Sequence, residues 1–220
     1  MAEVDTLKRI AECGVVPVIA LASAEQAGPL AEALLAGGLP VVEITFRTAA
    51  AADAIRTVAR DYPDVLLGAG TVLSAENLDR AVDAGARFGV APGFNPAVVR
   101  RAAELDVPFV PGVATPTDVE AALAARCRVL KFFPAGALGG PAMLAALSAP
   151  YKHTGVRFVP TGGVKAENFA DYLAVDTVTA CGGTWLAKKD ALAAGDWAGV
   201  TARCAEAVEI VRAARGAKET

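Results

Sequence analysis

Two charged residues stand inside apolar runs and are the strongest candidates for chemistry in this sequence. Lys131 lies in "VLKFFP" (129–134) and Glu43 lies in "VVEIT" (41–45). Burying a charge is costly unless the charge is paired or used, so a lysine within an apolar strand is uncommon. A structural ion pair between the two side chains is one interpretation. We favour catalysis, because partial desolvation disfavours the ammonium form and a free amine attacks carbonyl carbons.

The alternation of side chains along each run indicates where both charges point. Successive side chains of a strand face opposite sides of the sheet. Val42 and Ile44 are expected to face outward, which turns Glu43 inward, and the same alternation turns Lys131 inward in the second run. Both charges are therefore expected inside a sheet, close to the carboxyl ends of their strands.

Eight β-branched runs alternate with alanine-rich amphipathic stretches and must position these residues. The runs cover 15–20, 41–45, 65–69, 87–91, 108–113, 128–132, 157–160 and 177–181, and clear helical stretches cover 24–36, 50–61, 75–84 and 116–125. Capping residues precede helices at Ser23, Ser74 and Asn95, and glycines end them at Gly37, Gly85 and Gly155. Eight evenly spaced units predict an α/β fold of the (β/α)₈ TIM-barrel type rather than an open doubly wound sheet. Residues Met1–Gly14 are expected to add an N-terminal helix at the barrel bottom. No linker interrupts 1–220, which predicts a single domain.

Composition excludes several classes of partner. The chain has 21 Lys+Arg and 24 Asp+Glu and a net charge of −3, so neither nucleic acid nor a membrane surface is an expected partner. No apolar run approaches the roughly 18 residues of a membrane span, and the start "MAEVDTLKRI" does not resemble a signal peptide. We expect a cytoplasmic protein with reduced, mostly buried thiols at four scattered positions: Cys13, Cys127, Cys181 and Cys204.

A single histidine limits the available chemistry further. His153 lies in the polar stretch "YKHTG", which we interpret as a surface loop. A zinc site built from histidines is excluded, and a Ser-His-Asp or Cys-His arrangement would have to use this residue. We therefore predict no metal site, and we expect acid–base chemistry to fall mainly on carboxylates, lysines or tyrosines.

Glycines and hydroxyl residues gather where the runs end. The third run ends in "GAGT" at Thr71, the seventh in "PTGG" (160–163) and the eighth in "CGGT" (181–184). The loops after the seventh and eighth strands are the usual phosphate site of this barrel. Paired glycines let backbone N–H groups approach phosphate oxygens, and Thr184 adds a hydroxyl donor. These two segments together predict a phosphate-binding site.

Longer motifs give the chain a family resemblance. It resembles the 2-keto-3-deoxy-6-phosphogluconate (KDPG) aldolase / 4-hydroxy-2-oxoglutarate aldolase family, which consists of class I aldolases on a (β/α)₈ barrel, typically homotrimeric. The resemblance rests on "GLPVVEITFR" (38–47), "GAGTV" (68–72), "APG" (91–93), "KFFPA" (131–135), "PTGGV" (160–164) and "GGTWL" (182–186). It covers nearly the whole chain.

The resemblance implies a role for each matching position. Lys131 forms the Schiff base and Glu43 shuttles protons. The positions implied to bind substrate are Arg47 and Thr71 for the pyruvate carboxylate, Pro92 and Phe133 as pocket walls, Thr161 near the hydroxyls, and Gly162, Gly163, Gly182, Gly183 and Thr184 around the phosphate. A protonated imine withdraws electrons from the bond being cleaved, so neither a metal nor another cofactor is implied.

The implied reaction is the cleavage of KDPG to pyruvate and D-glyceraldehyde 3-phosphate in the Entner–Doudoroff pathway. Cleavage of 4-hydroxy-2-oxoglutarate to pyruvate and glyoxylate is a second implied reaction, and the sequence leaves the preference between the two open. Two alternatives remain: another phosphate-binding barrel enzyme, such as an isomerase or decarboxylase, in which Lys131 acts electrostatically, and a non-catalytic sugar-phosphate binder.

Two positions depart from the family pattern. Position 184 is threonine where serine is more usual, and the hydroxyl is kept. Arg126 stands where the pattern has a glycine five residues before the lysine. We expect the second departure to change a local loop at the entry to the sixth strand and to leave catalysis intact.

Overall fold

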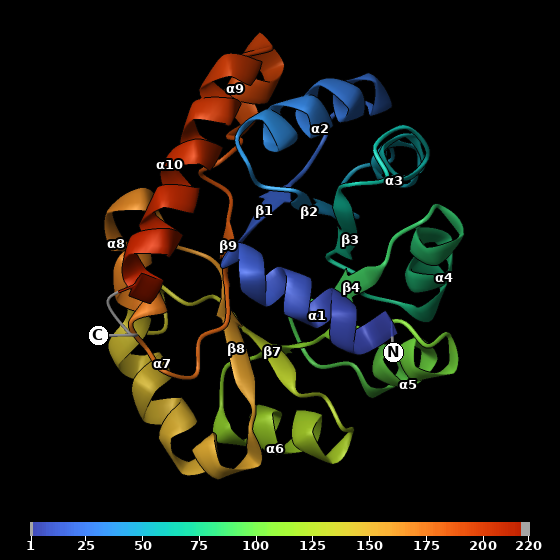
Figure 1. The fold of residues 1–220 in the computed structure, drawn as a ribbon. Coiled ribbons are helices and arrows are strands. Elements are labelled where there is room, and N and C mark those ends of the chain that lie inside the picture. Colours follow the sequence, from blue (N-terminus) through green and yellow to red (C-terminus); the bar gives the residue numbers. More distant parts are fainter. Residues whose placement is uncertain (1, 217–220) are drawn as a thin grey trace.

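A ring of parallel strands with helices on its outside forms the body of the protein in the computed structural model, which describes residues 2–216 (Figure 1). The strands are β1 (Val15–Ile19), β2 (Val41–Thr45), β3 (Leu66–Gly70), β4 (Phe88–Val90), β5 (Phe109–Val110), β6 (Gly112–Val113), β7 (Val129–Phe132), β8 (Arg157–Pro160) and β9 (Cys181–Gly183). The α-helices are α1 (Ala2–Cys13), α2 (Ala27–Ala36), α3 (Ala51–Asp61), α4 (Ala75–Asp83), α5 (Pro96–Glu104), α6 (Pro116–Ala124), α7 (Gly140–Ser148), α8 (Ala166–Leu173), α9 (Lys189–Ala194) and α10 (Trp197–Gly216), and two short 3₁₀ helices are η1 (Ala24–Gln26) and η2 (Ala149–Thr154).

The strands close into a barrel in chain order. One run of neighbours is β5-β4-β3-β2-β1-β9 and the other is β6-β7-β8, with parallel pairing throughout. Parallel bridges from Phe158 to Val178 and from Thr161 to Gly182 join β8 to the β9 segment. The expected (β/α)₈ barrel is confirmed, and its carboxyl-terminal face is where such barrels place their chemistry.

The run expected as one fifth strand is divided at Pro111. Residues 109–110 pair with β4, and residues 112–113 pair with β7. Proline has no N–H to donate to a strand ladder, so the pairing changes partner where it stands. The Pro111 carbonyl still accepts a hydrogen bond of 2.8 Å from the Lys131 N–H, which ties the site lysine to this break.

The eighth strand begins later than expected. We expected it at 177–181, but regular pairing starts at Cys181, opposite Val15 of β1. Gly182 and Gly183 therefore lie inside β9, and the expectation that they follow the strand is wrong. An added Cβ at Gly183 would lie 2.0 Å from the Trp185 ring, so the strand needs glycine there for close packing.

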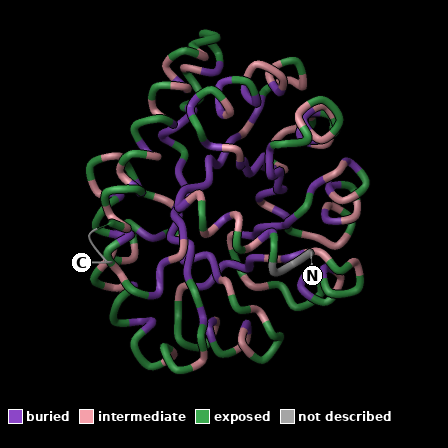
Figure 2. Tube along the Cα trace, viewed as in Figure 1, coloured by how far each residue is buried: buried purple, intermediate pink, exposed green. Residues whose placement is uncertain are grey.

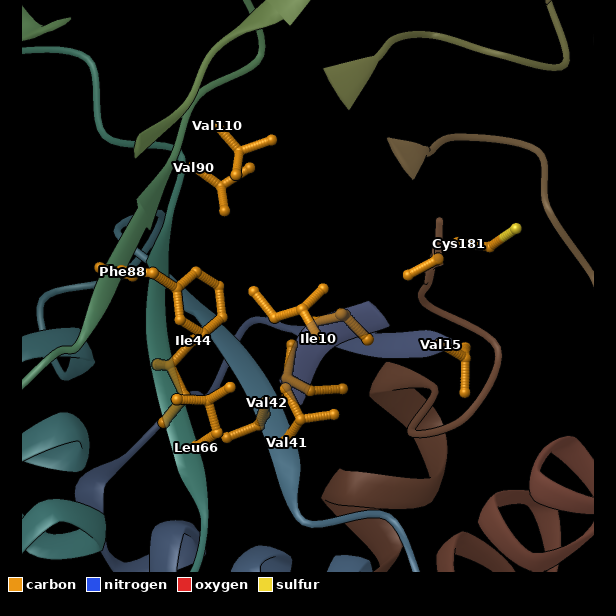
Figure 3. Packing of buried hydrophobic residues seen from close by; sticks show 14 of the residues in the cluster. Ile10, Val15, Val41, Val42, Ile44, Leu66, Phe88, Val90, Val110 and Cys181 are labelled. Carbon is orange, nitrogen blue, oxygen red and sulfur yellow. The ribbon is translucent and has the colours of Figure 1, made fainter. Parts of the chain in front are cut away.

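Helix α1 closes the amino-terminal end of the barrel, as expected. It crosses one end of the ring in Figure 1, and its Ile10 side chain belongs to the same buried cluster as Val15 and Val41, which Figure 3 labels. Val15 and Val41 are the first residues of their strands, so this end is the barrel bottom. Met1, which belonged to the expected helix, lies outside the described residues.

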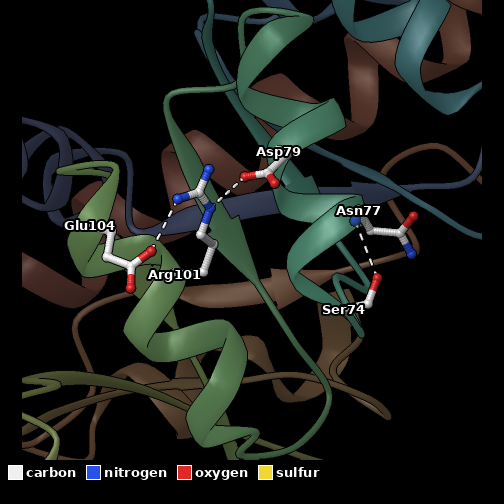
Figure 4. A network of polar contacts seen from close by, with 5 residues as sticks. All are labelled: Ser74, Asn77, Asp79, Arg101 and Glu104. Carbon is white, nitrogen blue, oxygen red and sulfur yellow. Dashed lines mark hydrogen bonds and ion pairs between the residues drawn. The ribbon is translucent and has the colours of Figure 1, made fainter.

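Two of the three expected caps begin α-helices, Ser74 at α4 and Asn95 at α5, whereas Ser23 precedes the 3₁₀ helix η1 and α2 begins only at Ala27. The Ser74 hydroxyl accepts a hydrogen bond of 3.2 Å from the Asn77 N–H at the start of α4 (Figure 4). Arg101 of α5 donates to Asp79 of α4 at 2.8 Å and to Glu104 of its own helix at 3.0 Å. These bonds fix the register between two neighbouring helices on the barrel surface.

Burial is concentrated in the strands (Figure 2). The outer faces of the helices are exposed, and one connected apolar cluster runs from the strands into the inner helix faces. A few polar side chains interrupt this interior, among them Glu43, Thr45, Lys131 and Thr161. Within residues 2–216, no helix is both long and apolar enough to cross a membrane.

Candidate active site

Lys131 and Glu43 meet inside the barrel. Lys131 comes from β7 and Glu43 from β2, and the Lys131 Nζ lies 3.5 Å from the Glu43 Oε1. The two residues are only 5% and 3% exposed. The inward orientation expected from strand alternation is confirmed for both. A carboxylate at this distance from an amine is placed to accept or return its proton.

Glycines in two neighbouring strands make room for this pair. An added Cβ at Gly70 of β3 would lie 2.0 Å from the Glu43 Oε1. At Gly112, which pairs with Lys131, an added Cβ would lie 2.1 Å from the Pro92 carbonyl oxygen. Side chains at these two positions would displace the carboxylate and the loop after β4, so both glycines shape the site.

Phe133 links the lysine to the loop after β8. Its ring centroid lies 5.5 Å from the Lys131 Nζ, within the range of a cation–π contact. The same ring packs against Gly162, where an added Cβ would lie 3.1 Å from it. Gly162 and Gly163 have φ angles of 86° and 85°, a conformation that disfavours other residues. The Gly162 carbonyl accepts from the Gly136 N–H at 2.7 Å, which pins this loop to the one after β7.

Thr161 and Gly182 lie side by side at the barrel mouth. Thr161 is buried at the end of β8, and its hydroxyl donates to the Val159 carbonyl at 3.4 Å. An added Cβ at Gly182 would lie 2.2 Å from the Thr161 hydroxyl oxygen. The glycine therefore lets β9 approach a hydroxyl that faces the interior.

Arg47 and Thr184 share a cavity of about 460 Å³ at the carboxyl ends of β1, β2 and β9. Both residues are exposed. Val18 also lines the cavity and pairs with Glu43, so the cavity extends to the strand position next to the Glu43 carboxylate. The full lining is Val18, Ala20, Ala22, Gln26, Arg47, Thr48, Thr184, Ala187, Lys189, Leu192 and Ala193.

Thr71 and Pro92 lie just after β3 and β4. Thr71 is half-buried with a φ of 54°, a strained conformation for a β-branched residue and one found at functional sites. Among residues 2–216, Thr71 makes no hydrogen bond to Lys131 or Glu43. The Pro92 carbonyl packs on Gly112, and Gly112 is the strand partner of Lys131.

The cysteines and the histidine stand apart from this site. None of the four cysteines forms a disulfide within residues 2–216, and Cys181 and Cys204 are buried. Burial raises the pKa of Cys181 far above its ordinary value and the pKa of Cys204 to about 12, with Arg203 lowering the latter slightly. Both thiols are therefore protonated and unreactive at neutral pH. His153 is exposed as expected, although it lies in η2 rather than in a loop.

Comparison with known proteins identifies the family. The family described as KDPG and KHG aldolase matches residues 6–203. The chain belongs to the KDPG and KHG aldolase family. A 2-dehydro-3-deoxy-phosphogluconate aldolase of Treponema pallidum (strain Nichols) is 50% identical over 90% of this chain and 93% of its own. The KHG/KDPG aldolase of Escherichia coli (strain K12) is 43% identical over 89% of this chain and 91% of its own.

Solved structures of KDPG aldolases have the same fold. The KDPG aldolase of Legionella pneumophila, solved with pyruvate captured at low pH as a covalent carbinolamine intermediate, is 37% identical with a TM-score of 0.87 over 91% of this chain and 96% of its own. The Zymomonas mobilis ZM4 enzyme, solved with 3-phosphoglycerate, is also 37% identical, with a TM-score of 0.85 over 94% and 96%. The protein is an aldolase, and therefore a lyase.

Several residues at this aldolase site were not expected from the sequence. Gly70 and Gly112 contribute by lacking a side chain, which leaves room for Glu43 and for the loop after β4. Gln26, Thr48 and Lys189 line the cavity beside Arg47. Gly70 lies in the "GAGT" motif, so the sequence did mark this position as part of a candidate site. The cavity residues have no such signal, because they come from separate loops that only the strand order brings together.

Proposed function

We propose that the protein cleaves KDPG to pyruvate and D-glyceraldehyde 3-phosphate through a Schiff base on Lys131. The observation that carries this proposal is the buried pair of Lys131 and Glu43, with 3.5 Å between amine and carboxylate. A lysine held away from water beside one carboxylate suits imine formation, which needs a free amine and a partner that moves protons.

The reaction follows from this geometry. The Lys131 amine adds to the C2 carbonyl of the substrate, and Glu43 donates the proton that lets water leave from the carbinolamine. The protonated imine takes up the electron pair of the C3–C4 bond as that bond breaks, while the Glu43 carboxylate takes the proton of the C4 hydroxyl. Glyceraldehyde 3-phosphate departs, Glu43 protonates the remaining enamine carbon, and water releases pyruvate and the free lysine.

The remaining residues hold the two ends of the substrate in this proposal. Arg47 and Thr71 bind the carboxylate next to the imine, and Arg47 has no ion pair with any residue from 2 to 216. Thr161 contacts the hydroxyls, and Pro92 and Phe133 form walls. Around the phosphate stand Gly162, Gly163, Gly182, Gly183 and Thr184. In the described part of the chain, the N–H groups of Gly162, Gly163 and Thr184 donate to no protein acceptor, so they are available to donate hydrogen bonds to a phosphate.

Cleavage of 4-hydroxy-2-oxoglutarate is a second proposed activity. The Lys131–Glu43 pair and Arg47 act on the part that both substrates share, a 2-oxo acid with a hydroxyl at C4. The phosphate contacts add binding for the longer substrate without entering the chemistry.

The setting of the enzyme is also a proposal. We propose a cytoplasmic homotrimer of single-domain barrels, which rests on the family resemblance and on four cysteines without a disulfide among the described residues, as a reducing compartment maintains them. Sedimentation equilibrium would give three times the chain mass of 22.3 kDa if this is correct, and the mass of a monomer or dimer would refute it.

Pyruvate release tests the proposed activity. Purified protein is incubated with KDPG or with 4-hydroxy-2-oxoglutarate, and pyruvate is followed by coupling to lactate dehydrogenase. Release from KDPG is the expected result. An isomerase or a binding protein releases no pyruvate, and a decarboxylase releases carbon dioxide instead, so absence of pyruvate from both substrates would refute the proposal.

A further inference from the structure

We infer that Lys189 is a specificity-determining residue that supplies the positive charge for the phosphate end of the substrate. The inference rests on the proposed function and adds to it a cation outside the glycine cradle. Lys189 is the first residue of α9, and it lines the same cavity as Arg47 and Thr184.

The lining of this cavity selects for anions. Its charged residues are Arg47 and Lys189, and neither aspartate nor glutamate lines it. Thr48 and Thr184 add hydroxyls, and the Thr48 Oγ1 is buried with no hydrogen-bond partner among the described residues. A cavity with two cations, unused donors and no carboxylate favours a ligand with negative charge at both ends. KDPG is such a ligand, with a carboxylate beside C2 and a phosphate on C6.

Gln26 holds the helix that carries Lys189 against the cavity. The Gln26 side-chain amide donates to the Leu192 carbonyl of α9 at 3.0 Å. Its amide oxygen accepts from the Ala22 and Ser23 N–H groups at 3.0 and 3.4 Å. These three bonds join the loop after β1 to α9, so the backbone of Lys189 has a fixed position in the wall.

The segment between Thr184 and Lys189 is anchored as well. Arg203 of α10 donates from Nε to the Leu186 carbonyl at 2.9 Å, and Leu186 is fully buried. Thr184 and Lys189 therefore extend from the two ends of one fixed segment. The Lys189 ammonium makes no ion pair or hydrogen bond with any residue from 5 to 216, so it is available to a ligand.

A phosphate monoester carries a charge between about −1.5 and −2 at neutral pH. The N–H groups of Gly162, Gly163 and Thr184 are neutral donors, so a nearby ammonium adds an attraction that they lack. In 4-hydroxy-2-oxoglutarate the distal carboxylate is C5 itself, bonded to C4, and is several bonds nearer to the imine than the phosphate of KDPG. Lys189 should therefore favour the longer substrate.

The test compares two neighbouring lysines. Lys188 is exposed and does not line the cavity, so Lys188→Ala is a matched control for Lys189→Ala. At low ionic strength, Lys189→Ala should lower kcat/KM for KDPG about 2- to 5-fold, chiefly through KM, which is the range for one screened charge. The loss for 4-hydroxy-2-oxoglutarate should be smaller. Lys189→Glu should lose more than Lys189→Ala, and Lys189→Arg should stay near wild type.

Ionic strength and inorganic phosphate give independent readouts. The deficit of Lys189→Ala should shrink as salt is added, and inorganic phosphate should inhibit this variant less than wild type. If Lys189→Ala behaves as Lys188→Ala does, or if both substrates lose equally, the inference is wrong although the aldolase assignment stands. Failure of wild type to release pyruvate from either substrate would instead refute the proposed function on which the inference rests.

Discussion

At the residue scale, the central feature is a pair of charges that depend on each other. Lys131 and Glu43 are both almost fully buried, and the structure gives each the other as its charged partner. Removing one partner of a buried pair leaves an uncompensated charge and commonly costs about 3–5 kcal/mol. Substitutions that keep the shape of the side chain are therefore the informative ones.

Glu43→Gln separates proton transfer from binding. The amide keeps the shape of the carboxylate but cannot take up a proton, so exchange at the pyruvate methyl group should slow by about 10²-fold or more. The measurement is the loss of the methyl proton signal by NMR in deuterated water. Exchange at the wild-type rate would mean that another group acts as the base. A cooperative thermal melt well above the assay temperature is the control for folding.

Strand alternation alone was enough to predict the inward orientation of Lys131 and Glu43. The roles of Gly70 and Gly112 could not be predicted from the sequence. Whether a glycine makes room for a neighbour depends on which residue of the next strand lies opposite it. Lys189 looks like an ordinary solvated lysine in the sequence. Its nearness to Gln26 depends on the pairing of β1 with β9, which are far apart in the chain.

At the element scale, the structure shows what the departure from the family pattern at Arg126 does to the backbone. It follows α6 with a φ of 65°, and its N–H donates to the Leu123 carbonyl at 2.9 Å. This left-handed conformation is the usual end of a helix, where glycine carries no steric penalty. The expected local change is therefore backbone strain just before β7, on the side of the barrel away from the site.

Arg126→Gly should stabilise the protein. The relief of left-handed strain, less the greater freedom of glycine in the unfolded chain, gives a gain of roughly 0.5–1 kcal/mol in the free energy of unfolding. Urea denaturation measures it. Arg128→Gly is the matched control, because Arg128 does not have a positive φ, and this change should destabilise. A loss of stability in Arg126→Gly would contradict the account.

Asp118 makes the start of α6 sensitive to acid. Its carboxylate accepts from the Ala114 and Thr115 N–H groups at 3.0 and 2.9 Å. Partial burial raises the pKa of this carboxyl, but the hydrogen bonds from Ala114 and Thr115 outweigh burial and leave the pKa below its ordinary value. A lowered pKa in the folded state means that the ionised carboxylate stabilises the fold above the unfolded pKa, and that this stabilisation is lost as pH falls through the folded value.

Asp118→Asn should therefore destabilise the protein at pH 7 by about 0.5–1 kcal/mol, and the difference from wild type should begin to shrink below about pH 4 and vanish once the pH is below the lowered pKa of the folded state. Chemical denaturation across the pH range measures this. Asp171→Asn serves as the control, since Asp171 makes no such bond within the described residues and should show little difference at any pH. A difference that persists at low pH would show that the amide disturbs the cap sterically.

Helix starts could be predicted because both partners of a cap lie within a few residues, as Ser74 and Asn77 do. Strand limits could not be predicted as well. The β-branched residues at 177–179 favoured a strand, but a single bridge from Val178 to Phe158 is the pairing found there, and regular pairing with β1 begins at Cys181.

At the scale of the whole molecule, residues that stabilise the barrel bottom lie at the opposite end from the candidate active site. Ile10 of α1 closes the bottom among the first residues of the strands (Figure 3), while Lys131 and the cavity lie toward the opposite end. The alternation of runs and helices was enough to predict this layout, because eight similar units leave few other arrangements.

Ile10→Ala should lower stability without changing catalysis. The side chain is 3% exposed, so its truncation should cost about 2–4 kcal/mol in the free energy of unfolding. The value of kcat, measured well below the melting temperature, should stay within about twofold of wild type because the cavity forms at the far end. A large fall in kcat with an unchanged melting temperature would mean that the two ends are coupled.

The most direct test of the account is reductive trapping of the imine. The protein is incubated with pyruvate and sodium borohydride, digested, and the modified peptide is sequenced by mass spectrometry. The account predicts one pyruvyl adduct, on Lys131, and none on Lys131→Arg, because a guanidinium stays protonated and forms no imine. The same variant should lose KDPG cleavage by at least about 10³-fold. An adduct on another lysine, or no adduct in a wild-type protein that cleaves KDPG, would contradict the Schiff base on Lys131.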